Sequence, residues 1–296
     1  ANALGGRSLA MVNIVGQPIP TNGHHSNVDS RGHNVKCANM MGDQIRTFHD
    51  AMNSVFISDL QDAKISAMGG KYNNVTGIFT GCLNSDARDA ADRRLIQGII
   101  PDGVVSVAEQ DHLFDVKTLG PGQVCNGHAN NTVETGAVAG RQKQVNIDYH
   151  KRAKELDLKF NHTSEDAIGP VQAKLLSFGV NGRVLGPVIG AYGEVSSDVY
   201  LLRDLIAQKL AASLTAKILM STEQAIAVYK RKLNRHWGLL IARGWVRVLL
   251  GRRNFINGSA AGVEPVARNG SLFDPDPDAY ANITPRFQDH IFRGRA

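Results

Sequence analysis

Apolar residues recur at the spacing of an α-helix in four long stretches of the chain. In residues 42–65 the apolar positions include Ile45, Phe48, Met52, Val55 and Phe56, and in residues 141–160 they are Val145, Tyr149, Ala153, Leu156 and Phe160. Positions three and four apart share one face of a helix, so each stretch is predicted to be amphipathic and helical. Two more helices are predicted, at 198–220 after a cap at Ser196 or Ser197, and at about 222–250.

Short runs rich in β-branched and apolar residues predict strands at 73–83, 103–108, 112–119 and 183–193. The polar residues 109–111 separate the second and third runs, which is typical of a turn. Short helices are predicted at 85–98, capped by Ser85 or Asp86 and ended by Gly98, and at 169–179. The order predicts a mixed α/β fold: a small mixed β-sheet flanked by helices, followed by C-terminal helices.

Composition divides the chain into four predicted parts. Residues 1–40 are rich in Gly, Asn, Ser and His without periodicity, and are predicted to be a flexible N-terminal arm. Residues 41–220 form the α/β core, residues 221–257 a basic C-terminal helix, and residues 258–296 an irregular tail.

Charge and cysteine content narrow the class of protein. Of 296 residues, 43% are hydrophobic and 20% are charged, as in a folded soluble protein. No apolar run approaches the ~18 residues of a membrane span, and the first residues lack the shape of a signal peptide. Three scattered cysteines without CxxC spacing favour a reducing, intracellular compartment, and a nuclear one if the partner is DNA. Because the sequence does not begin with Met, we expect a larger parent polypeptide.

The positive charge is concentrated in one segment. Residues 224–263 hold eight Lys or Arg and no acid, while the remaining 25 basic residues are outnumbered by 27 acidic ones. On a helix the apolar side chains would lie on one face and the basic ones on another. The apolar face could then pack on the protein while the basic face binds a phosphate backbone. DNA is therefore a predicted partner, and the alternative is a surface helix without one. The predicted DNA contacts are Lys230, Arg231, Arg235, Arg243 and Arg247.

Two carboxylates and a lysine lie at the ends of the predicted strands. Asp102 precedes the 103–108 strand, and Asp115 and Lys117 lie within 112–119, two residues apart and so on the same face. Carboxylates are the ligands that Mg²⁺ or Mn²⁺ prefers, and a lysine beside a metal-bound water can assist hydrolysis. We expect Asp102, Asp115 and the backbone carbonyl of Val116 to bind the metal, with Lys117 catalytic. The alternative is a set of surface charges.

The segment with Pro101-Asp102, twelve intervening residues and Asp115-Val116-Lys117 resembles the PD-(D/E)xK motif of restriction-like nucleases. That resemblance implies a metal-dependent DNA endonuclease with a core of helix, three strands, helix and strand over about 43–193. It also assigns a catalytic role to Gln144, where related nucleases carry Gln or Lys. The stretches from "FDVKTL" to "HWGLLIARGWVRVLLGRRN" are similar to the C-terminal endonuclease region of some non-long-terminal-repeat retrotransposon polyproteins, which implies a nicking domain of a mobile element.

The chain departs from the nuclease pattern at one position. Many members carry a Glu on the first core helix, but this chain has no Glu before Glu109. Asp43, Asp50 or Asp59 on the predicted 42–65 helix is a possible substitute, and the sequence does not choose among them. This departure keeps open a second prediction, a catalytically inactive nucleic-acid-binding module on the same fold.

Overall fold

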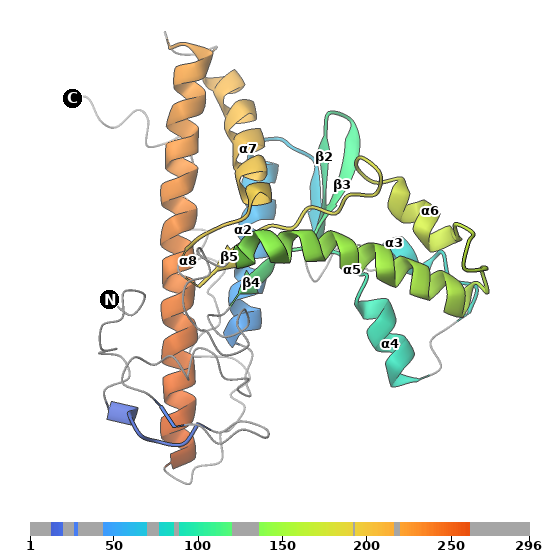
Figure 1. Cartoon of the computed structure of the whole chain (residues 1–296). Coiled ribbons are helices and arrows are strands. Elements are labelled where there is room, and N and C mark those ends of the chain that lie inside the picture. The colour runs from blue at the N-terminus through green and yellow to red at the C-terminus, as the bar shows by residue number, and fades with distance from the viewer. Residues whose placement is uncertain are drawn as a thin grey trace.

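The computed structural model describes residues 13–19, 27–28, 44–69, 77–85, 89–119, 136–191, 193–215 and 220–260. Helices and strands are mixed, as the sequence predicts (Figure 1). In chain order the main elements are α2 (Gln44–Asp62), β1 (Ala67–Gly69), α3 (Gly77–Thr80), α4 (Ala90–Gln97), β2 (Gly103–Val107), β3 (Gln110–Phe114), β4 (Lys117–Leu119), α5 (Ala137–Phe160), α6 (Pro170–Leu176), β5 (Val188–Gly190), α7 (Ser197–Thr215) and α8 (Thr222–Ala260). No helix in these ranges is long and apolar enough to cross a membrane.

The strands form two small sheets that meet at residues 114–117. Strands β1, β2 and β3 pair antiparallel in that order, and β4 pairs parallel with β5. Leu185, just before β5, connects the sheets, because its N–H donates to Leu113 O of β3 at 2.8 Å and its carbonyl accepts from Asp115 N–H at 2.9 Å. Lys117 N–H of β4 donates to Pro187 O at 2.9 Å. Residues 185–190 thus run in parallel beside the end of β3 and the whole of β4. The second and third strands of the sequence prediction are therefore a hairpin whose second arm bends at Asp115.

The hairpin turn is tighter than the sequence predicts. Val107 pairs with Gln110, so only Ala108 and Glu109 form the turn, and both have positive φ, 49° and 66°. A two-residue turn with both φ values positive matches the right-handed twist of paired strands. Gln110 and Asp111, predicted as turn residues, instead begin β3.

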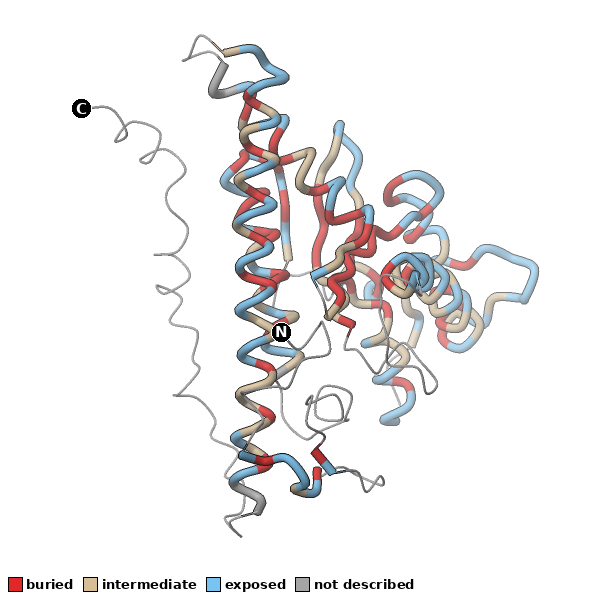
Figure 2. Tube along the Cα trace, turned by 60° about the vertical axis from the view of Figure 1, so that its left-hand side comes forward, coloured by how far each residue is buried: buried red, intermediate tan, exposed pale blue. Residues whose placement is uncertain are grey.

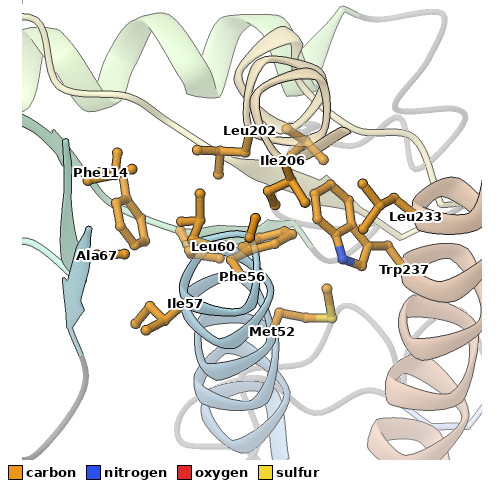
Figure 3. Packing of buried hydrophobic residues seen from close by; sticks show 14 of the residues in the cluster. Met52, Phe56, Ile57, Leu60, Ala67, Phe114, Leu202, Ile206, Leu233 and Trp237 are labelled. Carbon is orange, nitrogen blue, oxygen red and sulfur yellow. The ribbon is translucent and has the colours of Figure 1, made fainter. Parts of the chain in front are cut away.

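Helices cover both faces of the β2–β3 hairpin. Val105 and Phe114 join a cluster with α2, α7 and α8, whereas Val104 and Leu113 join a second cluster with α5 and α6. This alternation follows from the two-residue period of a strand. In Figure 3, Phe56 and Leu60 of α2 lie between the sheet and the side chains of α7 and α8. Helix α2 is thus a central layer of the larger core.

The middle of α8 packs closely against the start of α2. A Cβ at Gly244 would lie 2.2 Å from the Phe48 ring, so only glycine permits this approach. The adjacent Trp245 makes an edge contact with Phe48, with ring centroids 5.2 Å apart, and its indole N–H donates to Gly190 O at 3.0 Å. These contacts fix α8 to α2 and to the end of β5.

Two local predictions are wrong. The described part of the predicted 73–83 strand contains α3, a helix, because Ile78, Phe79 and Cys82 at helical spacing pack on the second cluster. The cap of α4 is Asp89, whose carboxylate accepts from Asp92 N–H, rather than Ser85 or Asp86. The helix begins later than predicted, so the cap moves with it. Gly98 ends α4 as predicted.

Described residues near the N-terminus pack against the C-terminal part of α8. Ile14, Ile19 and Val28, from the predicted flexible arm, are buried in one cluster with Ile256 of α8. Helix α8 also continues to Ala260, beyond the predicted boundary at 257. The rest of the arm and the tail from 261 lie outside the described residues.

A buried carboxylate between α2 and α8 predicts a pH-dependent stability. Asp59 is 2% exposed and accepts from Trp237 Nε1 at 2.6 Å, and burial raises the pKa of Asp59 to about 6. Because the folded state holds this proton more tightly than the unfolded state, the free energy of unfolding should fall as pH rises from about 4 through 6. The full effect is about 3 kcal/mol for a pKa shift of that size.

Asp59→Asn removes the buried charge and should abolish that decline, so the variant should be more stable than wild type by about 1–2 kcal/mol at pH 8. The measurement is urea unfolding between pH 4 and 8, with Asp166→Asn, an exposed acid outside α2, as the control. Parallel stability curves for wild type and Asp59→Asn would contradict the expectation.

Candidate functional site

Asp102 and Asp115 lie together at the open end of the β2–β3 hairpin. Asp102 directly precedes β2 and Asp115 directly follows β3, and Asp102 N–H donates to Phe114 O at 3.0 Å. The two carboxyl groups are close enough to share a hydrogen bond. Antiparallel pairing thus brings together two side chains that are thirteen positions apart in the sequence.

Lys117 and Val116 take the orientations that strand alternation predicts. Lys117 Nζ lies 2.6 Å from Asp115 Oδ2, on the same side of the strand. The Val116 side chain is fully buried in the core on the other side. Its backbone N–H donates to Asp102 Oδ2 at 2.8 Å, so the bend after β3 ties the main chain to the first carboxylate.

His49 of α2 completes the cluster, and the sequence analysis missed it. Its Nε2 lies 3.0 Å from Asp102 Oδ2 and 2.8 Å from Val116 O, and its Nδ1 lies 3.0 Å from Asp50 Oδ1. All three partners are acceptors, so both ring nitrogens carry protons. One turn later, Asn53 Nδ2 donates to Asp102 O at 3.2 Å. The available signal was a pair of polar residues at i and i+4 beside the apolar face of α2.

The electrostatics of the cluster follow from these contacts. Burial opposes charge on the His49 ring, but the hydrogen bonds and charge of Asp102, with help from Asp50, outweigh it and raise the pKa of His49 to about 9. Burial acts against ionised Asp102 too, yet His49 lowers the pKa of that carboxyl below its usual value. Burial and the neighbouring Asp102 raise the pKa of Asp115 to about 7, despite Lys117. Near neutral pH, Asp102 is therefore the fixed anion and Asp115 the carboxyl that readily exchanges a proton.

The remaining sequence-predicted site residues lie elsewhere. Gln144 is on the exposed face of α5 and donates to Asp148 at 2.7 Å, so its contact is within its own helix rather than with the carboxylate cluster. Among the three acids considered on the first helix, Asp50 approaches the cluster through His49, and Asp59 is buried against Trp237. Asp43 lies outside the described residues.

The basic helix has the two faces that its sequence predicts. Leu233, Trp237, Ile241 and Val248 are buried. The four predicted arginine contacts are exposed: Arg231, Arg235, Arg243 and Arg247. Buried and exposed positions alternate along the helix in Figure 2. Lys230 Nζ pairs with Asp204 Oδ2 of α7 at 2.8 Å.

The cluster offers a donor set that suits a divalent cation. The Asp102 carboxylate and the Val116 carbonyl converge on the protonated Nε2 of His49, which a cation bound to these two oxygens would have to displace. Oxygen donors of this kind are what Mg²⁺ and Mn²⁺ prefer. Nowhere in the described ranges do three or more His, Cys, Asp or Glu side chains form a ready-made metal site. Any cation here would rest on two carboxylates and a main-chain oxygen, leaving positions for water and substrate.

Comparisons of the chain with protein-family models, with curated proteins and with solved structures find no match.

Proposed function

We propose that the protein is a divalent-metal-dependent DNA endonuclease, which hydrolyses phosphodiester bonds at the Asp102–Asp115 cluster. The observation that carries the proposal is the convergence of Asp102, Asp115 and Lys117 at one bend of the sheet. Each carboxyl group has its own cationic partner, His49 for Asp102 and Lys117 for Asp115, and the two pairs meet at a partly exposed edge. Magnesium sites typically use one or two carboxylates, and two are adjacent here.

The element order supports the restriction-nuclease resemblance. Helix α2, strand β1, the β2–β3 hairpin, helix α5 and strand β5 follow one another in the order of that core, with α3, α4, β4 and α6 as additions. The motif residues lie where the hairpin opens beside the parallel strand β5. We therefore propose a restriction-like core, and a mobile-element nicking domain as its source, with a nuclear place of action.

Each residue of the cluster has a proposed role. Asp102, Asp115 and the Val116 carbonyl would hold Mg²⁺ or Mn²⁺, which supplies an activated water and neutralises charge on the phosphate. Lys117, 2.6 Å from Asp115, orients the water or offsets developing negative charge. His49 holds Asp102 and Val116 in place through Nε2, and it lies on the helix where the family pattern has its early Glu.

We propose that the exposed arginines of α8 bind the phosphate backbone of duplex DNA. Helix α8 packs directly on Phe48, the neighbour of His49 in α2, so the basic helix contacts the helix that supplies His49 to the cluster. Phosphate contacts supply affinity without sequence readout. The chain can therefore hold DNA by α8 while the cluster acts on a strand.

The alternative is a nucleic-acid-binding module that does not cut. Two observations favour this module. The chain lacks the Glu that the family carries on its first core helix, and His49 hydrogen-bonds to the same oxygens that would bind the metal. It differs from the nuclease in one outcome only, which is cleavage.

The test is incubation of wild-type protein with supercoiled plasmid and Mg²⁺ or Mn²⁺, with DNA binding measured beside it in Ca²⁺. We expect nicked product that requires the metal and is lost in Asp115→Asn, while the affinity for DNA is unchanged. Binding without nicking under either metal would support the alternative and refute the nuclease.

A further inference from the structure

Both lone-pair sites of one Asp102 oxygen are in use. Asp102 Oδ2 accepts two hydrogen bonds, from the Val116 N–H at 2.8 Å and from His49 Nε2 at 3.0 Å. A carboxylate oxygen has room for two such bonds. The Val116 carbonyl accepts from the same His49 Nε2 at 2.8 Å. A cation that binds these two oxygens therefore has to take the place of a donor that is already there.

Of the two donors, the His49 side chain is the one that can leave. The Val116 N–H belongs to a main chain that is fixed by the backbone hydrogen bonds of the residues on either side of it. The Val116 side chain is also fully buried in the core. The His49 side chain is 20% exposed, and its Nδ1 pairs with Asp50, whose side chain is 58% exposed. A partner for the displaced ring therefore lies on the solvent side of the cluster.

The charges of the cluster are balanced by its own side chains. Asp102 pairs with His49 at 3.0 Å, and Asp115 pairs with Lys117 at 2.6 Å. With both acids ionised these four charges cancel, so the cluster as a whole attracts a divalent cation weakly. Once the imidazolium of His49 has left, the same oxygens carry an uncompensated negative charge, and a cation is attracted more strongly. His49 thus supplies at these oxygens the positive charge that a metal would supply.

We propose that the His49 side chain occupies the position of the metal in the metal-free protein, and that it leaves Asp102 and Val116 when Mg²⁺ or Mn²⁺ binds. His49 is then a positioning residue with two effects. It keeps the two oxygens in place before the metal arrives, and it lowers the affinity of the site for the metal. This role rests on the proposed cation site, but it does not depend on DNA cleavage.

The test compares the Mn²⁺ affinity of full-length wild type and His49→Ala, measured by electron paramagnetic resonance of free Mn²⁺. We expect His49→Ala to bind about tenfold more tightly, because hydrogen bonds to a charged group no longer compete with the metal. Arg46→Ala is the control, since it removes a 70%-exposed cation from the same helix without touching either oxygen, and it should bind like wild type. Equal or weaker binding by folded His49→Ala would overturn the inference, and so would the same gain in Arg46→Ala.

A second measurement needs no variant. The Nε2 proton of His49, which its hydrogen bonds protect from exchange with water, is followed by nuclear magnetic resonance in wild type. We expect its signal to disappear when the site is saturated with Mg²⁺, and to persist in NaCl of the same ionic strength. A signal that persists while Mg²⁺ displaces Mn²⁺ from the site would overturn the inference.

The outcomes separate this role of His49 from the proposed function. If wild type and His49→Ala bind Mn²⁺ equally at a site that Asp102→Asn/Asp115→Asn removes, the cation site stands and the role of His49 is wrong. If neither protein binds Mn²⁺, both are wrong. Tighter binding by His49→Ala without nicking of DNA under any metal would support the role of His49 and refute the nuclease.

Discussion

Replacing Lys117 with methionine is expected to slow metal-dependent DNA cleavage by about 10²–10³-fold while sparing the affinity for metal. A charged group aimed at a reacting centre typically contributes that much to the rate. The affinity should persist because Lys117 is a neighbour of the proposed ligand Asp115 rather than a ligand itself, with 2.6 Å between Nζ and Oδ2. The measurement is single-turnover cleavage at saturating protein, which separates the chemical step from binding.

Lys151→Met, at an exposed lysine of α5 outside the cluster, is the matched control and should cleave like wild type. Lys117→Arg keeps the charge and should recover part of the rate. If Lys117→Met cleaves at the wild-type rate, the lysine is only a partner that balances Asp115, and its proposed role in hydrolysis is wrong.

Removing four arginines from α8 should have the second large effect, on the salt dependence of DNA binding. Each phosphate contact contributes about −0.9 to the slope of log affinity against log salt. With Arg231, Arg235, Arg243 and Arg247 replaced by Gln, the slope should flatten by roughly 3–4 units. Between 50 and 200 mM salt, wild type should then lose about 10² more affinity than the variant. The loss should be alike for unrelated DNA sequences, because phosphates carry no sequence information.

Four exposed lysines elsewhere provide the control: Lys64, Lys151, Lys154 and Lys174. Their replacement by Gln removes the same charge without touching α8, and it should leave the slope nearly unchanged. A folded arginine variant that keeps the wild-type slope would show that this face of α8 does not contact the phosphate backbone. Lys230 is left in place in both variants because it pairs with Asp204.

The sequence predicts the hairpin because strand geometry is local, but the predicted turn at 109–111 would place Asp102 opposite Thr118. The two-residue turn at Ala108 and Glu109 shifts the register, so that Asp102 lies beside Asp115. The period of two residues then directs Lys117 toward Asp115 and Val116 into the core. The amphipathic pattern of α8 is equally local, and its buried and exposed faces match the prediction.

The rest of the site depends on tertiary packing that no local pattern contains. His49 reaches Asp102 only because α2 packs across the hairpin, and on its own helix it is one polar residue among several. Gln144 was assigned through resemblance, and the rotation of α5 turns it outward. The error at residues 77–80 arose because a short apolar run fits a buried strand or a buried helical turn equally well.

We propose that Asp102 and Asp115 together form a divalent-cation site. Electron paramagnetic resonance counts free Mn²⁺ directly, so a titration of the full chain with Mn²⁺ measures this site without reference to activity. We expect a wild-type site that is lost in Asp102→Asn/Asp115→Asn. We also expect the site to be retained in Glu109→Gln/Asp111→Asn, which removes two acids from the opposite end of the same hairpin. Equal Mn²⁺ binding by all three proteins would show that Asp102 and Asp115 do not form a cation site.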